Sequence, residues 1–260
     1  MNQQPHPQAT RPPDSLPWTD LILQLADTAL VLGQRNAEWC GHGPVLEQDI
    51  AITNISLDLV GQARLLYQLA ADRLGGGATE DSLAYLRTER EYRNLLLVEQ
   101  PRGDWGQTVL RQFLFTQFQH LQYELLLSCP LDQLAAIAAK SRKETAYHLR
   151  WSGEWVIRLG DGTEESHRRM RHALGELWRF TGELFAASPC ELACGMDPAG
   201  LQPVWLDQVT AVLREATLPV PAPGETFMQT GGKLGRHSEH LGYLLAEMQV
   251  LQRTYPGATW

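Results

Sequence analysis

The sequence predicts an all-α protein, and three observations lead to this fold class. Apolar residues recur at helical spacing through several long segments, and glycine or proline separates these segments. No segment shows the alternation of apolar and polar residues that is typical of strands, and no repeat period is present. With 260 residues and 43% hydrophobic residues, the chain can build one large core. We therefore expect a single helical domain over residues 18–260.

Composition excludes several classes of function. The formal charge of −8 and a pI near 5.5 disfavour binding to nucleic acid or to an anionic membrane surface. Four cysteines without a CxxC pair indicate neither a disulfide framework nor a zinc ribbon. No apolar run approaches the roughly 20 residues that span a bilayer, and the N-terminus lacks the features of a signal peptide. We expect a cytoplasmic protein that is not exported.

The first 17 residues differ from the rest of the chain. They contain five prolines and almost nothing to bury, so residues 1–17 are expected to be a disordered lead outside the fold. The sequence CGHGP then breaks the first helix, and this short break predicts an antiparallel neighbour. Three consecutive glycines end the second helix, and Asp104 can cap the third. The four long helices are expected at 18–39, 46–74, 104–128 and 131–159.

Shorter elements complete the predicted architecture. Residues 79–100 are expected to form one or two short helices in a long crossover, a connection that occurs in ferritin-like four-helix bundles. A fifth helix is capped by Thr163, and PVPAP is predicted to be an extended linker. TGGKLGRHS fails the spacing of a phosphate-binding loop, so we interpret it as a flexible lead into the last helix. The additional helices are expected at 163–187, 204–217 and 237–253.

Polar residues interrupt the second helix, whose pattern is otherwise typical of a helix enclosed by others. Asn54, Asp58 and Gln62 share one face at a spacing of four residues, with Gly61 beside them. On the fourth helix Glu144 and His148 are neighbours on an apolar face. A helical bundle can hold a cofactor between such faces, but a structural partner for Asp58, or a hydrogen-bonded pair of Glu144 and His148, also satisfies these groups.

A carboxylate-bridged metal pair needs more ligands than this pattern supplies. Such bundles take one Glu from each of two helices and a Glu-x-x-His motif from each of the other two. Here Asp58 is followed three residues later by Gly61, which has no side chain, and Glu144 is followed at that spacing by Tyr147. His148 is displaced by one residue. The sequence therefore argues against a complete diiron site.

Several long blocks carry a resemblance to a known family. These blocks are EWCGHGPVLEQDIAITNISLDLVGQARLLY, TEREYRNLLLVEQP, KETAYHLRWSGEW, LWRFTGELF and GGKLGRHSEHLGYLLAEMQVLQRTYPGATW. From about Trp18 to Trp260 the chain resembles the C subunits of bacterial ring-1,2-phenylacetyl-CoA epoxidases, the phenylacetate-CoA oxygenases of aerobic phenylacetate breakdown. The resemblance implies a ferritin-like fold and a stable complex with a homologous A subunit, which holds the diiron centre and binds the CoA thioester. It also implies a small B subunit and a flavin and iron–sulfur reductase in the NADPH-dependent monooxygenase assembly.

The resemblance implies a non-catalytic structural subunit without a cofactor or metal of its own. Asp58, Glu144 and His148 are then a vestigial polar core at the metal position of the family, and His148→Ala is predicted to weaken the fold or the complex. Two alternatives stay open. In the first alternative, the chain is itself a diiron oxygenase with an atypical ligand set. In the second, it is a stand-alone helical module that binds an acyl-CoA. The phosphates in that last case would meet residues 167–172, or Lys233 and Arg236, although the basic run at 167–172 is more typical of a solvated face.

Overall fold

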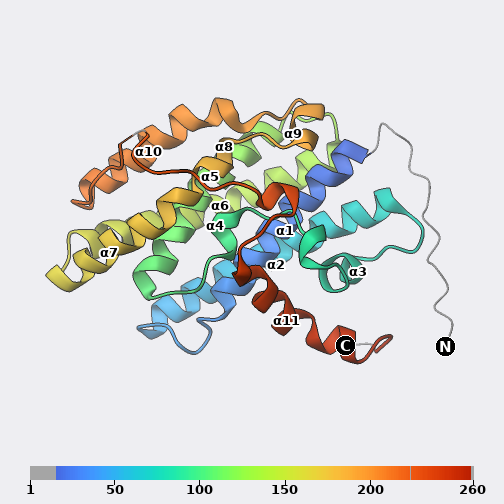
Figure 1. Ribbon diagram of the computed structural model, residues 1–260, viewed down its shortest axis with the longest axis horizontal. Helices are drawn as coiled ribbons and strands as arrows, with labels where there is room; N and C mark the ends of the chain where they lie inside the picture. The colour runs from blue at the N-terminus through green and yellow to red at the C-terminus, as the bar shows by residue number, and fades with distance from the viewer. Residues whose placement is uncertain (1–15, 223, 259–260) are drawn as a thin grey trace.

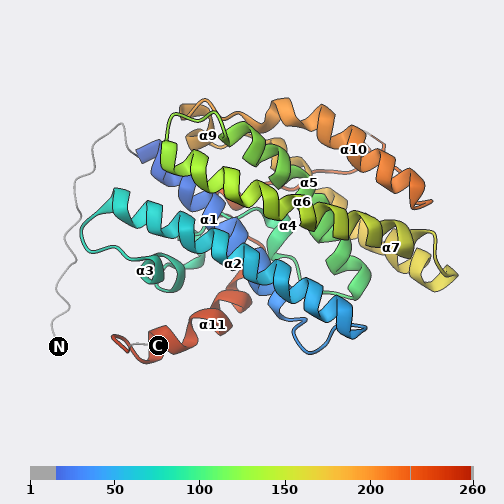
Figure 2. The same cartoon turned by 180° about the vertical axis from the view of Figure 1, so that it is seen from behind.

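The computed structural model describes residues 16–222 and 224–258, and these residues form helices and loops without a strand (Figure 1). Four long helices build the body of the protein in two adjacent pairs. α1 packs along α2, α5 packs along α6, and α2 also meets α6 (Figure 2). The predicted all-α, ferritin-like four-helix bundle is confirmed. The long helices are α1 (Leu16–Ala37), α2 (Leu46–Leu74), α5 (Trp105–Leu126) and α6 (Asp132–Gly160).

The ends of the long helices follow local sequence signals. Asp104 caps α5, because its side chain accepts a hydrogen bond of 2.9 Å from the backbone N–H of Gln107. α2 ends at Gly75, whose φ of 62° suits a residue without a Cβ. Most of the expected disordered lead, residues 1–15, lies outside the described residues. The last two residues of that segment, Leu16 and Pro17, begin α1, where proline is accepted in the first turn.

The crossover between α2 and α5 is made of short helices, as expected. A buried carboxylate ties it to the bundle: Asp27 of α1 accepts hydrogen bonds from the Tyr67 hydroxyl at 2.6 Å and from the backbone N–H of Arg93 at 2.8 Å. Arg87 of the crossover forms an ion pair with the same carboxylate. These donors compensate for the cost of burying a charge. The crossover comprises α3 (Glu80–Tyr85), the 3₁₀ turn η2 (Glu89–Glu91) and α4 (Leu96–Glu99).

Most of the chain after α6 covers the side of the bundle that faces the viewer in Figure 1. The predicted fifth helix, 163–187, is divided, because a 3₁₀ turn separates two α-helical pieces. α10 is fixed to α5 by Trp205, whose indole N–H donates to the Leu114 carbonyl at 3.0 Å. These elements are α7 (Glu164–Leu177), η3 (Trp178–Phe180), α8 (Gly182–Phe185), α9 (Pro189–Ala193), η4 (Pro198–Leu201), α10 (Gln202–Glu215), η5 (Gly232–Leu234) and α11 (Glu239–Thr254).

The segment before α11 is anchored, and the expectation of a flexible lead was wrong. Lys233 is 6% exposed, and its ammonium group lies 3.0 Å from both carboxylate oxygens of Glu191. The Glu183 carboxylate accepts 2.7 Å hydrogen bonds from the backbone N–H groups of Leu96 and Gly231. Buried donors and acceptors with this many partners hold a loop rigidly. Glycines had suggested flexibility, but they permit the close approach of this loop to the body.

α2 is less enclosed than its sequence indicated. Its inward face is buried, but Leu46, Ile50 and Leu57 are exposed by 72%, 52% and 63%. The low amphipathicity of this helix therefore reflects apolar residues on an open side as well as on the core side. None of the helices in the described parts of the chain is long and apolar enough to cross a membrane.

The segment before α11 is also held by His237, whose imidazole is charged. Its Nδ1 lies 2.8 Å from Glu99 Oε2, and its Nε2 lies 3.0 Å from the Tyr92 carbonyl oxygen. Because both partners accept hydrogen bonds, both ring nitrogens must carry a proton. Burial alone would lower the pKa of His237, but the hydrogen bond and charge of Glu99 outweigh burial and raise it.

We predict that the stabilisation by His237 is lost at alkaline pH. A raised pKa in the folded state gives stability that is fully present below the unfolded pKa of about 6.5 and disappears as the pH rises through the folded pKa. Urea unfolding of the wild type and of His237→Gln, from about pH 6 to about pH 9, measures this difference. The difference in free energy of unfolding between the two proteins should decrease with rising pH. A constant difference would contradict an ion pair between a charged His237 and Glu99. His172→Gln, on an exposed part of α7, is the control.

Candidate functional site

The candidate site lies where α2 meets α6, on the side of the bundle turned toward the viewer in Figure 2. Two pairs of polar side chains join the helices there, and we call them the polar rungs. Asp58 with His148 forms the first rung, and Gln62 with Glu144 forms the second. The i, i+4 spacing along each helix places the two rungs one above the other.

The first rung joins a partly exposed acid to a buried imidazole. His148 Nε2 lies 2.9 Å from Asp58 Oδ2, the His148 side chain is fully buried, and that of Asp58 is 38% exposed. Because a carboxylate accepts, Nε2 carries the proton of this hydrogen bond. Nδ1 of His148 is buried and has no hydrogen-bond partner. The rung thus satisfies one of the two ring nitrogens.

The second rung extends into a network of side chains from α5. Gln62 Nε2 donates to Glu144 Oε2 at 2.9 Å, and Gln62 Oε1 accepts from Gln119 at 3.1 Å and from the Tyr123 hydroxyl at 2.9 Å. The other oxygen of Glu144 accepts from Lys140 at 2.8 Å. Burial raises the pKa of Tyr123, so the phenol stays protonated as a donor. Both oxygens of the Glu144 carboxylate are therefore engaged.

The expected pair of Glu144 and His148 does not form. Each of the two side chains bonds to α2 instead, because the i, i+4 neighbours of α6 both point toward the facing helix. Gln119 and Tyr123, which complete the second rung, were missed in the sequence. Their i, i+4 spacing on the third long helix was the available signal.

The polar row of α2 does not stay on one side of the protein. Asn54 is exposed, Asp58 is partly exposed and Gln62 is buried. With 3.6 residues per turn, steps of four residues advance the row by about 40° each, so the row winds from solvent into the core. Gly61 stands on the outer side, where a Cβ would meet no atom within 4 Å. A side chain at this position would therefore have open space around it.

The residues present do not fit a dinuclear iron site. No group of three or more His, Cys, Asp or Glu side chains within residues 16–222 and 224–258 is arranged to hold a metal ion. Asp58 and His148 bind each other, and Glu144 is bonded to Gln62 and Lys140. Four carboxylates and two histidines would be needed. That this chain carries no metal remains a prediction, since metal content is a property of the purified protein.

The basic residues considered for phosphate binding are differently placed. Lys233 is buried against Glu191, whereas Arg236 is exposed. In the run 167–172, Arg168 and Arg169 both form ion pairs with Glu165 in the first turn of α7. This arrangement favours the interpretation of that run as a solvated, ion-paired face.

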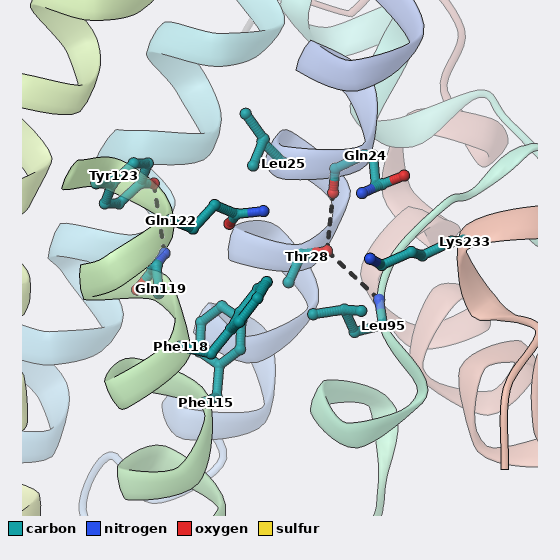
Figure 3. Close-up of a pocket in the computed structure, with 10 residues that line it drawn as sticks. All are labelled: Gln24, Leu25, Thr28, Leu95, Phe115, Phe118, Gln119, Gln122, Tyr123 and Lys233. Carbon is teal, nitrogen blue, oxygen red and sulfur yellow. Dashed lines mark hydrogen bonds between the residues drawn. The ribbon is translucent and has the colours of Figure 1, made fainter. Parts of the chain in front are cut away.

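The interior of the bundle offers little room for a ligand. A cavity between α1 and α5 is lined by Thr28, Phe115, Phe118 and Gln119 among others, and Lys233 reaches its edge (Figure 3). It leaves about 10 Å³ for the centre of a water molecule, which is space for roughly one water. Thr28 and the backbone of Leu95 bond across it. A coenzyme A thioester does not fit this cavity.

Together, the fold and the polar rungs define a ferritin-like bundle in which side-chain hydrogen bonds join α2 to α6. Comparisons with known proteins identify the group. Residues 1–260 match the family described as phenylacetic acid catabolic protein, and the chain belongs to that family. It is similar to the C subunit of the 1,2-phenylacetyl-CoA epoxidase of Escherichia coli (strain K12), with 48% identity over 247 residues, 93% of this chain and 98% of that protein. The resemblance inferred from the sequence is confirmed.

We predict that His148→Ala lowers the free energy of unfolding by about 1 to 3 kcal/mol, because it removes a buried ring and leaves the Asp58 carboxylate without its partner. Chemical denaturation followed by circular dichroism measures the change. His172→Ala, at an exposed histidine of α7, is the matched control and should stay within about 0.5 kcal/mol of the wild type. Equal stabilities of the two variants would contradict a structural role for the first rung.

Gly61→Ala is expected to stabilise the isolated chain by about 0.5 to 1 kcal/mol, since glycine is costly within a helix and the added Cβ meets no atom. The urea midpoint of the variant should rise with an unchanged m-value. Gly160→Ala is the opposite case, because its Cβ would lie 2.3 Å from the Ala216 carbonyl oxygen. A destabilised Gly61→Ala variant would show that this position is crowded.

Proposed function

We propose that this chain is the non-catalytic structural subunit of a phenylacetyl-CoA 1,2-epoxidase complex that acts in the breakdown of phenylacetate. Its main partner is a homologous A-type subunit, which holds the diiron centre and binds the CoA thioester. A small B subunit and a reductase complete the assembly, and the complex acts in the cytoplasm. Membership of the phenylacetic acid catabolic family and the similarity to an epoxidase C subunit support this assignment.

The observation that carries the proposal is that the side chains of the polar rungs are already hydrogen-bonded to one another. An oxygen-activating metal pair needs carboxylates and imidazoles that are free to bind metal. In this chain Asp58, Glu144 and His148 are bonded across α2 and α6, and the second histidine position is Gly61. The same residues hold the two helices in register, which is what a structural subunit requires of its core.

Two alternative functions fit the molecule less well. A diiron oxygenase with an atypical ligand set would have to break both rungs and still lack ligands. A stand-alone acyl-CoA module would need a pocket for the acyl chain and accessible cations for the phosphates. The cavity within the bundle is about the size of one water, and Lys233 is paired with Glu191. The exposed Arg236 lines an open surface hollow of about 410 Å³, where the neighbouring His237 is engaged by Glu99. The small cavity and the pairing of Lys233 favour the structural subunit.

Metal analysis tests the proposal directly. We expect iron to be absent from the chain purified alone from iron-supplemented medium, and present after co-expression with an A-type subunit that co-purifies with it. The control is the A-type subunit purified by itself. Iron at about two per chain in the isolated protein would overturn the proposal and make Asp58, Glu144 and His148 candidate ligands.

A further inference from the structure

One side of α2 carries an apolar stripe on the surface. Leu46, Ile50 and Leu57 are more than half exposed, Val60 is 36% exposed, and Gly61 lies beside them. Their spacing places these residues along one line of the helix, and we call this surface the α2 face. The helices α7 to α10 cover the other side of the bundle, so they leave this face open (Figures 1 and 2).

The stripe is confined to the first half of α2. Further along the same line stands Arg64, which forms an ion pair with Glu80. A helix at the surface of a monomer ordinarily presents polar residues to water along its whole length. Thr53 and Asn54 interrupt the stripe between Ile50 and Leu57, but four exposed apolar residues on one side of a helix, bordered by polar ones, indicate an interaction surface.

Gly61 makes the α2 face suited to a helical partner. A Cβ at this position would meet no atom within 4 Å, so the backbone of α2 is directly accessible there. The distance between packed helices depends on the side chains at the crossing point, and glycine permits the closest approach. Leu57, one turn before Gly61, would then pack against the flank of the partner helix.

The edge of the α2 face toward α6 carries charges of both signs. Asp58 is 38% exposed and Glu144 is 19% exposed, and Tyr147, 38% exposed, stands next to His148 on α6. Lys140 balances Glu144, and Arg150 lies over the Tyr147 ring. Within the described residues, Asp58 bonds to the imidazole of His148 alone. A cationic side chain on the partner could form an ion pair with the Asp58 carboxylate. A second copy of this chain would add another net charge of −8, which disfavours association of the chain with itself.

We propose that the α2 face docks a helix of a different subunit, with its crossing point at Gly61, apolar side chains over Ile50 and Leu57, and a Lys or Arg that pairs with Asp58. This inference rests on the proposed function, which supplies the A-type subunit as the partner. It also gives the first rung a second role. His148 holds Asp58 at the rim, so that the carboxylate is positioned for the incoming cation.

Binding of surface variants to the purified A-type subunit tests the docking face. Leu57→Glu places a charge in the apolar contact and should raise the dissociation constant at least about tenfold. Gly61→Phe should have a similar effect, because its ring occupies the crossing point. Tyr243→Glu is the matched control, since Tyr243 is 70% exposed on α11, and its binding should equal that of the wild type. Thermal melting of each free variant verifies that the fold is retained.

The charge component has its own readout. Asp58→Asn keeps a hydrogen-bond acceptor for His148 but removes the charge, so it should weaken binding and flatten the dependence of the dissociation constant on salt. An unchanged salt dependence would show that no cation of the partner pairs with Asp58.

The outcomes separate this inference from the proposed function. If the wild type does not bind the A-type subunit, the proposed function fails and the docking face with it. If the wild type binds and Leu57→Glu binds equally well, the α2 face is not the interface, although the subunit role stands. Weakening by Tyr243→Glu to the same degree as by Leu57→Glu also overturns the inference. Sedimentation of the chain alone adds a last outcome, since a homodimer dissolved by Leu57→Glu would assign the face to a second copy.

Discussion

Four buried carboxylates connect the crossover and the segment before α11 to the rest of the protein. Asp27, Glu99, Glu183 and Glu191 are each at most 1% exposed, and each accepts hydrogen bonds from segments that are distant in the sequence. The cost of burying a carboxylate is large unless several donors surround it. The crossover and the segment before α11 supply those donors through backbone N–H groups, Lys233 and His237. Their positions are therefore fixed by charge compensation as well as by packing.

The long helices were predictable because their determinants are local. The cap at Asp104, the glycines after α2 and the apolar periodicity can each be recognised within a short window of sequence. The anchored segment around Lys233 was not predictable in that way. Its partners Glu183 and Glu191 lie more than 40 residues away, and glycine-rich composition favours flexibility when the partners are unknown. Likewise, the apolar residues of α2 gave no indication of which side is covered, since burial depends on the neighbours.

The candidate site was predictable in part. Spacing along the chain singled out Asp58, Gln62, Glu144 and His148, and all four lie at the contact of α2 and α6. The pairing between them could not be predicted from the sequence. Periodicity defines the face of each helix on which a residue lies, but it does not determine which residue of the facing helix is opposite. Gln119 and Tyr123 were missed for the same reason. The sequence also did not show whether the eight tryptophans lie in the core or on the surface. The seven within the described residues are buried or partly buried. The large apolar side chains exposed in that part of the chain are therefore Leu, Ile, Val, Phe and Tyr.

The first rung connects the core to the surface at Asp58. Metal ligands in such a bundle must all point inward, which constrains the rotation of α2 about its own axis. In this chain α2 keeps Gln62 inside, whereas Asp58 stands at the edge and Leu57 and Gly61 face outward. Gly61 leaves the outer side of the helix without a side chain. Under the proposed structural role, the absence of a metal requirement and the open apolar face are thus two consequences of the same few residues of α2.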